Sequence, residues 1–528
     1  MNLRAPMSQM LKSSGAMGLA TMTSRVLGLA REMVYSRFMG NTWVASAFIL
    51  AYQLPNLMRR LLGEGALTAA FIPIFKERER NAGEKEMWHA ANAVISALIT
   101  ITAVIVVIAV VAISVILKYR VLSEKTRLML ELMRVMSPYV LLVCVAAVLI
   151  GIANARGHFF IPALGAAMLN VVMIGSVFLL APQFGATPET QIFGLAFGVL
   201  IAGVAQAVFQ WPILRKEGYS FQWVAPWEDA TVREVIRRML PGIVGVAAYQ
   251  LNVVLTQSFA FWYGDSIVAS FSYAVRFMEL PQGVFGISLA TYLLPTLSGL
   301  AAEKKYGEFR SNLLQGLSYL MYLNLLASAL LFTLAEPIIR LVFEGRKFDA
   351  LATQEVGQTL ACMAPGLIAF SSVNILARAF FALGDTQTPM RISAVCLGLN
   401  VVFSFWLIGT FGAPGVAVAN TLSSVFNVGL LMYALRRKMP KLDFSVLSGL
   451  LFNLFTCAVF AGLLAWALRE AWARFVGHAG LAARLGEVFI PMTLATLTYW
   501  VATLWLKIPA ATDMLNLVRH RFVKKPKS

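Results

Sequence analysis

The sequence predicts an all-α, polytopic membrane protein with about fourteen transmembrane helices. The prediction depends on an apolar composition, a series of apolar segments long enough to cross a bilayer, and an internal duplication. Of the 528 residues, 59% are hydrophobic and only 13% are charged, whereas a soluble domain carries roughly 25% charged residues. Residues 89–117 contain no Asp, Glu, Lys or Arg, and a run of about 20 such residues already crosses a hydrocarbon core.

The predicted spans follow from hydropathy read together with prolines, glycines and flanking charges. The second and eighth spans are long and contain Pro55 and Pro281. We expect kinks there, with the freed backbone groups satisfied by neighbouring helices. In chain order the predicted spans are 15–37, 43–74, 89–117, 130–154, 160–181, 192–214, 239–263, 267–298, 311–335, 357–383, 390–410, 415–435, 446–468 and 485–506.

Charges between the spans predict that both chain ends lie in the cytoplasm. About 26 Lys and Arg residues lie on the side of the termini and about 11 on the other side, and such an excess marks the cytoplasmic face. The loops 118–127 and 345–348 are exceptions to this rule. The first apolar segment contains Arg25 and Arg31, so it does not resemble the core of a secretory signal. The basic segments are KERERNAGEK (76–85), LRK (214–216), RR (237–238), KK (304–305), RRK (436–438) and RHRFVKKPK (519–527).

An internal repeat divides the chain into two homologous halves. Its landmarks keep an offset of 227 residues at first and then drift by a few residues. Six spans in each half make the two repeats parallel, a feature of transporters that bind substrate between two lobes. We predict an N-terminal lobe at 1–216, a C-terminal lobe at 217–438, and two added spans with a basic tail at 439–528. The landmarks are Met136-Ser-Pro138, Gly157, Pro162 and Leu169-Asn170-Val171-Val172, which recur as Met363-Ala-Pro365, Gly384, Pro389 and Leu399-Asn400-Val401-Val402.

Several arginines lie inside predicted spans, where each costs at least about 2.5–3.5 kcal/mol unless it faces water or a partner. Guanidinium groups bind phosphate through two parallel hydrogen bonds, so they point to an anionic cargo such as a diphosphate. Arg25, Arg59 and Arg276 are the deepest and the favoured functional residues. The intramembrane arginines are Arg25, Arg31, Arg59, Arg60, Arg276 and Arg378.

Other roles remain open for part of this set. Arg31, Arg37 and Arg60 also fit interfacial anchors, and Arg378 lies near a span end, which favours a structural role. Glu64 and Glu279 either pair with the arginines or carry a coupling ion. Arg25 and Arg31 are about 120° apart around a helix and Arg59 and Arg60 about 100° apart, so the arginines cannot all share one face.

The sequence also argues against several classes of protein. It contains no GxxxxGK[ST] nucleotide-binding loop, no catalytic triad, and no long segment outside the membrane for an enzyme domain. The four cysteines and four histidines lack metal-ligand spacing. The net charge of +18 is spread over short interhelical segments, which does not suggest nucleic-acid binding. We therefore predict a transporter without a cofactor or metal, rather than an enzyme.

Four motifs closely resemble the MurJ/MviN family of lipid II flippases, in the MOP exporter superfamily, and the resemblance extends over the whole chain. LPNLxRRLxxEGA is the most specific of them. The motifs are SRVLGLARE (24–32), LPNLMRRLLGEGALTAAFIPIF (54–75), RFMELPQGVFGISLATYLLP (276–295) and RAFFALGDTQTP (378–389).

The resemblance implies two six-helix lobes around a cationic cavity, with helices thirteen and fourteen forming an apolar groove for a polyprenyl tail. It implies a bacterial inner-membrane protein that moves undecaprenyl-diphosphate-linked disaccharide-pentapeptide, lipid II, to the periplasmic leaflet for peptidoglycan and cell-wall synthesis. Membrane lipids and cell-wall synthesis proteins would be its other partners. The family's essential arginines correspond to Arg25, Arg31, Arg59 and Arg276, and Ser24, Asn56, Arg60, Glu64 and Glu279 are expected to support them or to couple transport to an ion.

Two departures from the family pattern bear on ion coupling. Positions that are acidic in relatives are Ser46 and Val275 here, which weakens any coupling scheme based on them. Other hypotheses are a flippase for another polyprenyl-diphosphate glycan, a cation-coupled small-molecule exporter, and a scaffold that does not transport. An exporter of cationic drugs would use acidic and aromatic residues, whereas this chain offers arginines.

Overall fold

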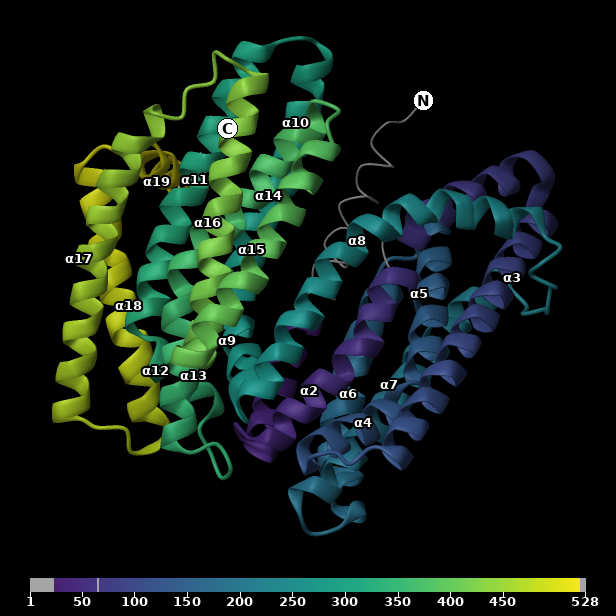
Figure 1. The fold of residues 1–528 in the computed structure, drawn as a ribbon. Helices are drawn as coiled ribbons and strands as arrows, with labels where there is room; N and C mark the ends of the chain where they lie inside the picture. Colours follow the sequence, from purple (N-terminus) through teal and green to yellow (C-terminus); the bar gives the residue numbers. More distant parts are fainter. Residues whose placement is uncertain (1–22, 64–65, 523–528) are drawn as a thin grey trace. The chain divides into compact units, whose positions relative to one another are not determined.

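The computed structural model describes residues 23–63 and 66–522. Within these ranges the chain is helical and has no β-strand beyond the isolated bridge between Gly345 and Phe348. This confirms the all-α prediction. The helices divide into two compact units, residues 1–261 and 262–528 (Figure 1). The lobe boundaries predicted at 216 and 438 stay a prediction.

Unit 1 begins, in its described part, with a helix over residues 23–39. Its α8 extends two residues past the unit boundary. The further helices of unit 1 are α2 (Trp43–Met58), the π-helical η1 (Arg59–Gly63), α3 (Ala66–Tyr119), α4 (Glu124–Met136), α5 (Tyr139–Ala155), α6 (Phe160–Leu179), the short 3-10 helix η2 (Ala181–Phe184), α7 (Pro188–Lys216) and α8 (Ala230–Tyr263).

Unit 2 holds the remaining helices, of which α17 and α18 correspond to predicted spans thirteen and fourteen. These helices are α9 (Ile267–Pro281), the π-helical η3 (Gln282–Ile287), α10 (Ser288–Ala302), α11 (Tyr306–Thr333), α12 (Ala335–Phe343), α13 (Ala350–Met363), the 3-10 helix η4 (Ala364–Gly366), α14 (Leu367–Ala382), α15 (Gln387–Phe411), α16 (Ala413–Lys438), α17 (Val446–Phe475), α18 (Gly480–Trp505) and α19 (Pro509–Phe522).

Ten described helices are long and apolar enough to cross a membrane, or eleven if α4 and α5, bent by 43°, form one span. The predicted count of fourteen is therefore not confirmed. Part of the first predicted span lies outside the described residues, and α2, with 16 residues, is shorter than the roughly 20 that a span needs. The charged stretch 76–85, expected as a loop, is part of α3, which breaks only at Gly83 (φ 87°). Lys, Glu and Arg are strong helix formers, so this stretch continues the helix.

At both prolines where kinks are expected, the α-helix gives way to a π-helical segment. Pro55 is followed by Arg59–Gly63, and Pro281 is followed directly by Gln282–Ile287. Proline lacks the amide proton that would bond to the carbonyl four residues earlier, and the wider π turn absorbs the resulting change of register. The two halves of the chain thus share this feature as well.

The same helix pairs pack in each unit, which supports the duplication. In unit 1, α2 packs on α4, and α7 packs on both α5 and α6. In unit 2, α9 packs on α13, and α16 packs on both α14 and α15. An offset of about 227 residues carries each helix of the first set onto its partner in the second.

The repeated glycines end the equivalent helices α5 and α14. Gly157 has φ 91° and Gly384 has φ 74°, a left-handed conformation that favours glycine. The amide nitrogens of His158 and Asp385 each donate to the carbonyl five residues earlier, at 2.9 Å in both turns. This is the Schellman ending of a helix. The backbone conformation of this ending explains why glycine recurs at the same position in both repeats.

An ion pair joins the turn after α5 to the end of α7, and another joins the turn after α14 to the end of α16. The acidic partner lies at the helix end in unit 1 and in the turn in unit 2. In unit 1, Arg156 Nε and His158 Nε2 both bind the Glu217 carboxylate at 2.8 Å. In unit 2, Lys438 Nζ binds Asp385 Oδ2 at 2.7 Å. The hydrogen bonds from His158 and Arg156 lower the pKa of Glu217. The hydrogen bond from Lys438 is the largest cause that lowers the pKa of Asp385 to about 2.

A buried ionic network attaches the added helices α17 and α18 to α12. Arg340 of α12 donates to Glu336 at 2.6 Å and to Glu487 of α18 at 2.8 Å. Arg469 of α17 donates to the other oxygen of Glu336 at 2.8 Å. The Glu487 side chain is only 1% exposed, and a buried charge of this kind persists only with paired partners. The network therefore fixes one end of the α17–α18 hairpin, which Figure 1 draws beside α11 and α12.

The unit 2 pair predicts a specific dependence of stability on pH. With a folded-state pKa of about 2, Asp385 stabilises the fold fully above its ordinary pKa of about 3.9. That stabilisation is lost as the pH falls toward 2. Replacing Lys438→Met should lower Tm at pH 7 by about 1–3 °C and make Tm less sensitive to pH between about 4 and 2. Thermal unfolding of the purified protein across this range measures both effects.

Lys441→Met is the matched control, because Lys441 is an exposed lysine near Lys438 that forms no ion pair among the described residues. The same pH profile for both variants would contradict the assignment.

Candidate functional site

One face of the helix over residues 23–39 packs on α6. Asn170 Nδ2 donates to the Ser24 carbonyl at 3.2 Å, and a side chain added at Gly28 would meet the same nitrogen at 3.7 Å. Arg31 NH1 lies 3.7 Å from Met173 Sδ. Positions 24, 28 and 31 follow the spacing of one helix face, and Asn170 and Met173 are one turn apart on α6. The two helices therefore pack along matching stripes.

Arg25 and Arg31 lie in different surroundings, because only Arg31 belongs to the packed stripe. The Arg31 side chain is 14% exposed and binds Glu32 at 2.6 Å. Its Nε is buried and has no hydrogen-bond partner among the described residues. Arg25 is exposed and forms no ion pair or hydrogen bond within the described ranges. The two side chains are expected about 120° apart around the helix. As a result, the guanidinium of Arg31 is bound to Glu32 while that of Arg25 is exposed.

The next two arginines of the predicted set occupy the π-helical segment η1. Arg59 donates through Nε and NH2 to Asn56 Oδ1, at 3.1 and 2.9 Å. Arg60 is exposed and donates to Gln250 of α8 at 3.4 Å. The two neighbours thus point to different partners. Glu64, predicted to pair with an arginine, lies outside the described residues.

Arg276 is the only predicted substrate-binding arginine in unit 2. Its NH1 binds Glu279 one turn further along α9, at 3.0 Å, and the two side chains are 43% and 53% exposed. This pair directly precedes Pro281 and the π-helical η3. Arg378 lies half-buried with its guanidinium 5.9 Å from the Phe381 ring, which fits the structural role expected for it.

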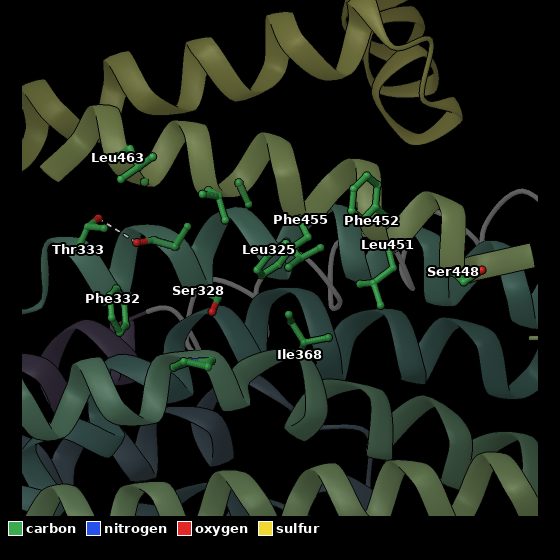
Figure 2. A pocket seen from close by; sticks show the side chains of 15 residues that line it. Leu325, Ser328, Phe332, Thr333, Ile368, Ser448, Leu451, Phe452, Phe455 and Leu463 are labelled. Atoms are coloured by element: carbon green, nitrogen blue, oxygen red, sulfur yellow. Dashed lines mark hydrogen bonds between the residues drawn. The ribbon is translucent and has the colours of Figure 1, made fainter. Parts of the chain in front are cut away.

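An apolar groove of about 730 Å³ lies in unit 2. The resemblance predicts a groove made by helices thirteen and fourteen, but this one places α17 against α11 and α14, and no residue of α18 lines it. Figure 2 shows Leu451, Phe452 and Phe455 of α17 on one wall and Leu325 and Ile368 on the other. Apart from hydroxyls such as Ser328 and Thr333, the walls are hydrocarbon and suit an aliphatic chain.

These features together suit an amphiphilic anion. Guanidinium groups supply fixed, always charged donors for phosphate oxygens, and the groove supplies an apolar surface. Across the described ranges no three His, Cys, Asp or Glu side chains gather closely enough to hold a metal ion.

Comparison with known proteins identifies the family. A model of the family described as lipid II flippase MurJ matches residues 35–483. The chain belongs to the MurJ family. A probable lipid II flippase MurJ from Rhizobium tropici is 30% identical over 500 residues, covering 93% of each chain. A probable lipid II flippase MurJ from Bdellovibrio bacteriovorus is 30% identical over 508 residues, covering 94% of this chain and 95% of the relative.

Solved structures agree on the fold. A lipid II flippase MurJ in an inward closed conformation superposes with a TM-score of 0.77 at 20% identity, covering 93% of this chain and 98% of that one. A multidrug resistance MATE transporter of the MOP superfamily superposes with a TM-score of 0.66 at 15% identity, covering 78% and 94%. The chain is therefore a multi-pass membrane protein with the fold shared by the MurJ and MATE families.

Sequence reasoning missed Glu32, which binds Arg31, and the contact of Asn170 with the backbone directly before Arg25. Glu32 follows Arg31 directly in the motif, and its carboxylate within a predicted span was a usable signal. Asn170 was noted as a repeat landmark, but its contact with Ser24 was not foreseen. A polar side chain inside an otherwise apolar segment could have indicated it.

The separation of Arg25 from Arg31 can be tested by thiol labelling. In a variant with the four native cysteines replaced by alanine, Arg25→Cys should react with a charged, membrane-impermeant thiol reagent roughly tenfold faster than Arg31→Cys, because reaction requires an accessible thiolate. The measurement is the labelling rate in vesicles. Val26 is exposed next to Arg25. The labelling rate of Val26→Cys therefore shows whether exposed side chains at this depth of the helix contact water or lipid. Equal rates at positions 25 and 31 would refute the separation.

Proposed function

We propose that this chain is a lipid II flippase, which carries the undecaprenyl-diphosphate-linked disaccharide-pentapeptide from the cytoplasmic to the periplasmic leaflet. The observation that carries the proposal is the complete set of four arginines, Arg25, Arg31, Arg59 and Arg276, inside a chain of the MurJ family. The curated relatives are named probable lipid II flippases. On this proposal the chain is a transporter and catalyses no covalent step.

The chemistry of the cargo explains why arginines are needed. A lipid with a diphosphate, sugars and a peptide cannot flip unaided, because each polar group would lose its water in hydrocarbon. Guanidinium donors in a wet cavity replace that water at the diphosphate through charge-assisted hydrogen bonds. The remaining head groups stay hydrated while the tail stays in lipid.

The four arginines enter this mechanism in different states. Arg25 is exposed and makes no hydrogen bond or ion pair within the described residues, so its guanidinium is available to a diphosphate in unit 1. Arg276 is also exposed, and Glu279 beside it sets its orientation. Arg31 is held by Glu32 and Arg59 by Asn56, and each guanidinium has five N–H donors, so these local bonds leave donors for the cargo. Glu279 and Arg60 remain supporting residues in the proposal.

The topology follows from the same proposal. The chain lies in the bacterial inner membrane with both termini in the cytoplasm, as the excess of Lys and Arg on one side supports. Lobes at 1–216 and 217–438 rock against each other and expose the cargo site to each side in turn. Cell-wall synthesis proteins on the periplasmic side receive the product.

The groove between α17, α11 and α14 binds the polyprenyl tail in this proposal. Its α17 wall faces outward, with Phe452 71%, Phe455 56% and Val459 42% exposed. A tail that moves there from the lipid leaves no water behind, so its binding depends on van der Waals packing against the preformed apolar surface.

Loss of one arginine should disable transport. Arg25→Ala or Arg276→Ala should weaken lipid II binding by about 10- to 100-fold, because a charge-assisted hydrogen bond contributes about 1.5–3 kcal/mol. Neither variant should support growth when the native protein is depleted. Binding to the purified protein and the leaflet location of lipid II in depleted cells are the measurements.

Arg346→Ala is the charge-matched control, since Arg346 is exposed in the turn over residues 345–348. It should bind lipid II like the wild type. Unchanged lipid II flipping after depletion of the protein would overturn the proposed function.

A bulky side chain in the groove should slow transport of substrates with a long prenyl tail but not of substrates with a short one. Val459→Trp places a large ring among the lining residues and should slow transport of full-length lipid II by about threefold or more. Transport of an analogue with a short prenyl chain should not change. Phe460→Trp is the control, because Phe460 is exposed on the same helix but does not line the groove. Equal effects on both substrates would remove the groove from the proposal.

A further inference from the structure

We propose that Asn170 of α6 is a positioning residue for Arg25, and this inference rests on the proposed function. Asn170 Nδ2 donates to the Ser24 carbonyl at 3.2 Å and to the Ala166 carbonyl of its own helix, also at 3.2 Å. The amide thus joins α6 to the backbone directly before Arg25. It acts on the cargo only through that backbone.

The position of Arg25 depends on its backbone because its side chain has no other support. It is exposed and makes no hydrogen bond or ion pair within the described residues. The position of the Arg25 guanidinium therefore depends on how the helix over residues 23–39 is rotated about its axis and shifted along it. The bond at Ser24 joins a side chain of α6 to the backbone of that helix directly before Arg25.

Desolvation makes this bond a strong restraint. Asn170 is 6% exposed, in a helix that is otherwise apolar on most sides. Rotation of the first helix would leave the amide hydrogen of Asn170 with one carbonyl fewer, in surroundings where water is absent. Gly28 lies on the same face, and the amide nitrogen is 3.7 Å from the position that a Cβ would take there, which is ordinary van der Waals contact. The bond therefore holds the helix in a single rotation.

A second contact of α6 supports the same alignment. Met173, one turn after Asn170, touches Arg31 at 3.7 Å. The two contacts define the rotation of the first helix about its own axis. Of the two, only the bond from Asn170 lies beside Arg25, so its loss should change Arg25 more than Arg31.

The experiment is a double-mutant cycle on lipid II affinity in the full-length protein. Purified wild type, Asn170→Ala, Arg25→Ala and the double variant are compared for binding of lipid II. Asn170→Ala alone should weaken binding about three- to tenfold, and it should have almost no further effect once Arg25 is alanine. Asn170→Asp keeps the shape but not the amide donor, so it should weaken binding at least as much as alanine.

A matched control comes from the repeat. Asn400 occupies the equivalent landmark in α15 and is also buried. Asn400 itself lies on α15 in unit 2, whereas Arg25 lies in unit 1, so the effects of Asn400→Ala and Arg25→Ala should multiply independently. In the double-mutant cycles on lipid II affinity, Arg25→Ala should be coupled to Asn170→Ala but not to Asn400→Ala.

The outcomes separate the inference from the proposed function. If Arg25→Ala binds lipid II like the wild type, the proposed role of Arg25 is wrong. If Arg25→Ala binds weakly but Asn170→Ala has its full effect in that background, Asn170 is merely structural and the inference is overturned. A variant that folds poorly is assessed by the labelling rate of a cysteine at position 25 in the folded fraction, which should change with Asn170→Ala. An unchanged rate also overturns the inference.

Discussion

The cost of a cation in hydrocarbon constrains the whole arrangement. Each guanidinium within the apolar segments must find a partner or water, and in the described structure three of them bind a side chain close by in the sequence. Arg31 uses the next residue, Glu32, while Arg59 and Arg276 use residues three positions away, Asn56 and Glu279. Partners one turn away form together with their helix and need no tertiary contact. This local supply explains why the motifs are short and contiguous, since each contains both the charge and the group that holds it.

Duplication has preserved geometry rather than charge. The turns at Gly157 and Gly384 have the same backbone hydrogen bonds, yet the ion pairs beside them run in opposite directions, Glu217 accepting in one unit and Lys438 donating in the other. The repeat therefore keeps the left-handed glycine and the presence of a pair, whichever partner is acidic. The intramembrane arginines lie outside this repetition, because the positions 227 residues after Arg25, Arg31 and Arg59 hold Asn252, Ser258 and Gly286.

Much of the fold could be predicted from the sequence, because hydropathy and repeat register act locally. The prolines at 55 and 281 marked the π-helical segments, and the Asn-containing landmarks marked equivalent helices. Two points were not foreseen, one for a local reason and one for want of tertiary information. Charged residues 76–85 were expected to break a helix but continue α3, since their helix propensity outweighs their polarity outside the membrane. The angle between Arg25 and Arg31 was calculable, but which of them faces α6 was not, because a sequence does not show the neighbour of a helix face.

Polar contacts attach the α17–α18 hairpin, whose α17 forms one wall of the groove, to the rest of unit 2. Arg469 and Arg340 hold α17 and α18 at one end through Glu336 and Glu487, and the Tyr499 hydroxyl donates to the Tyr322 carbonyl of α11 at 2.8 Å. Apolar packing is non-directional, so these directional bonds set the position of the α17–α18 hairpin against α11 and α12. The first helix shows the same division, because the bond from Asn170 and the contact of Met173 with Arg31 align its packing on α6.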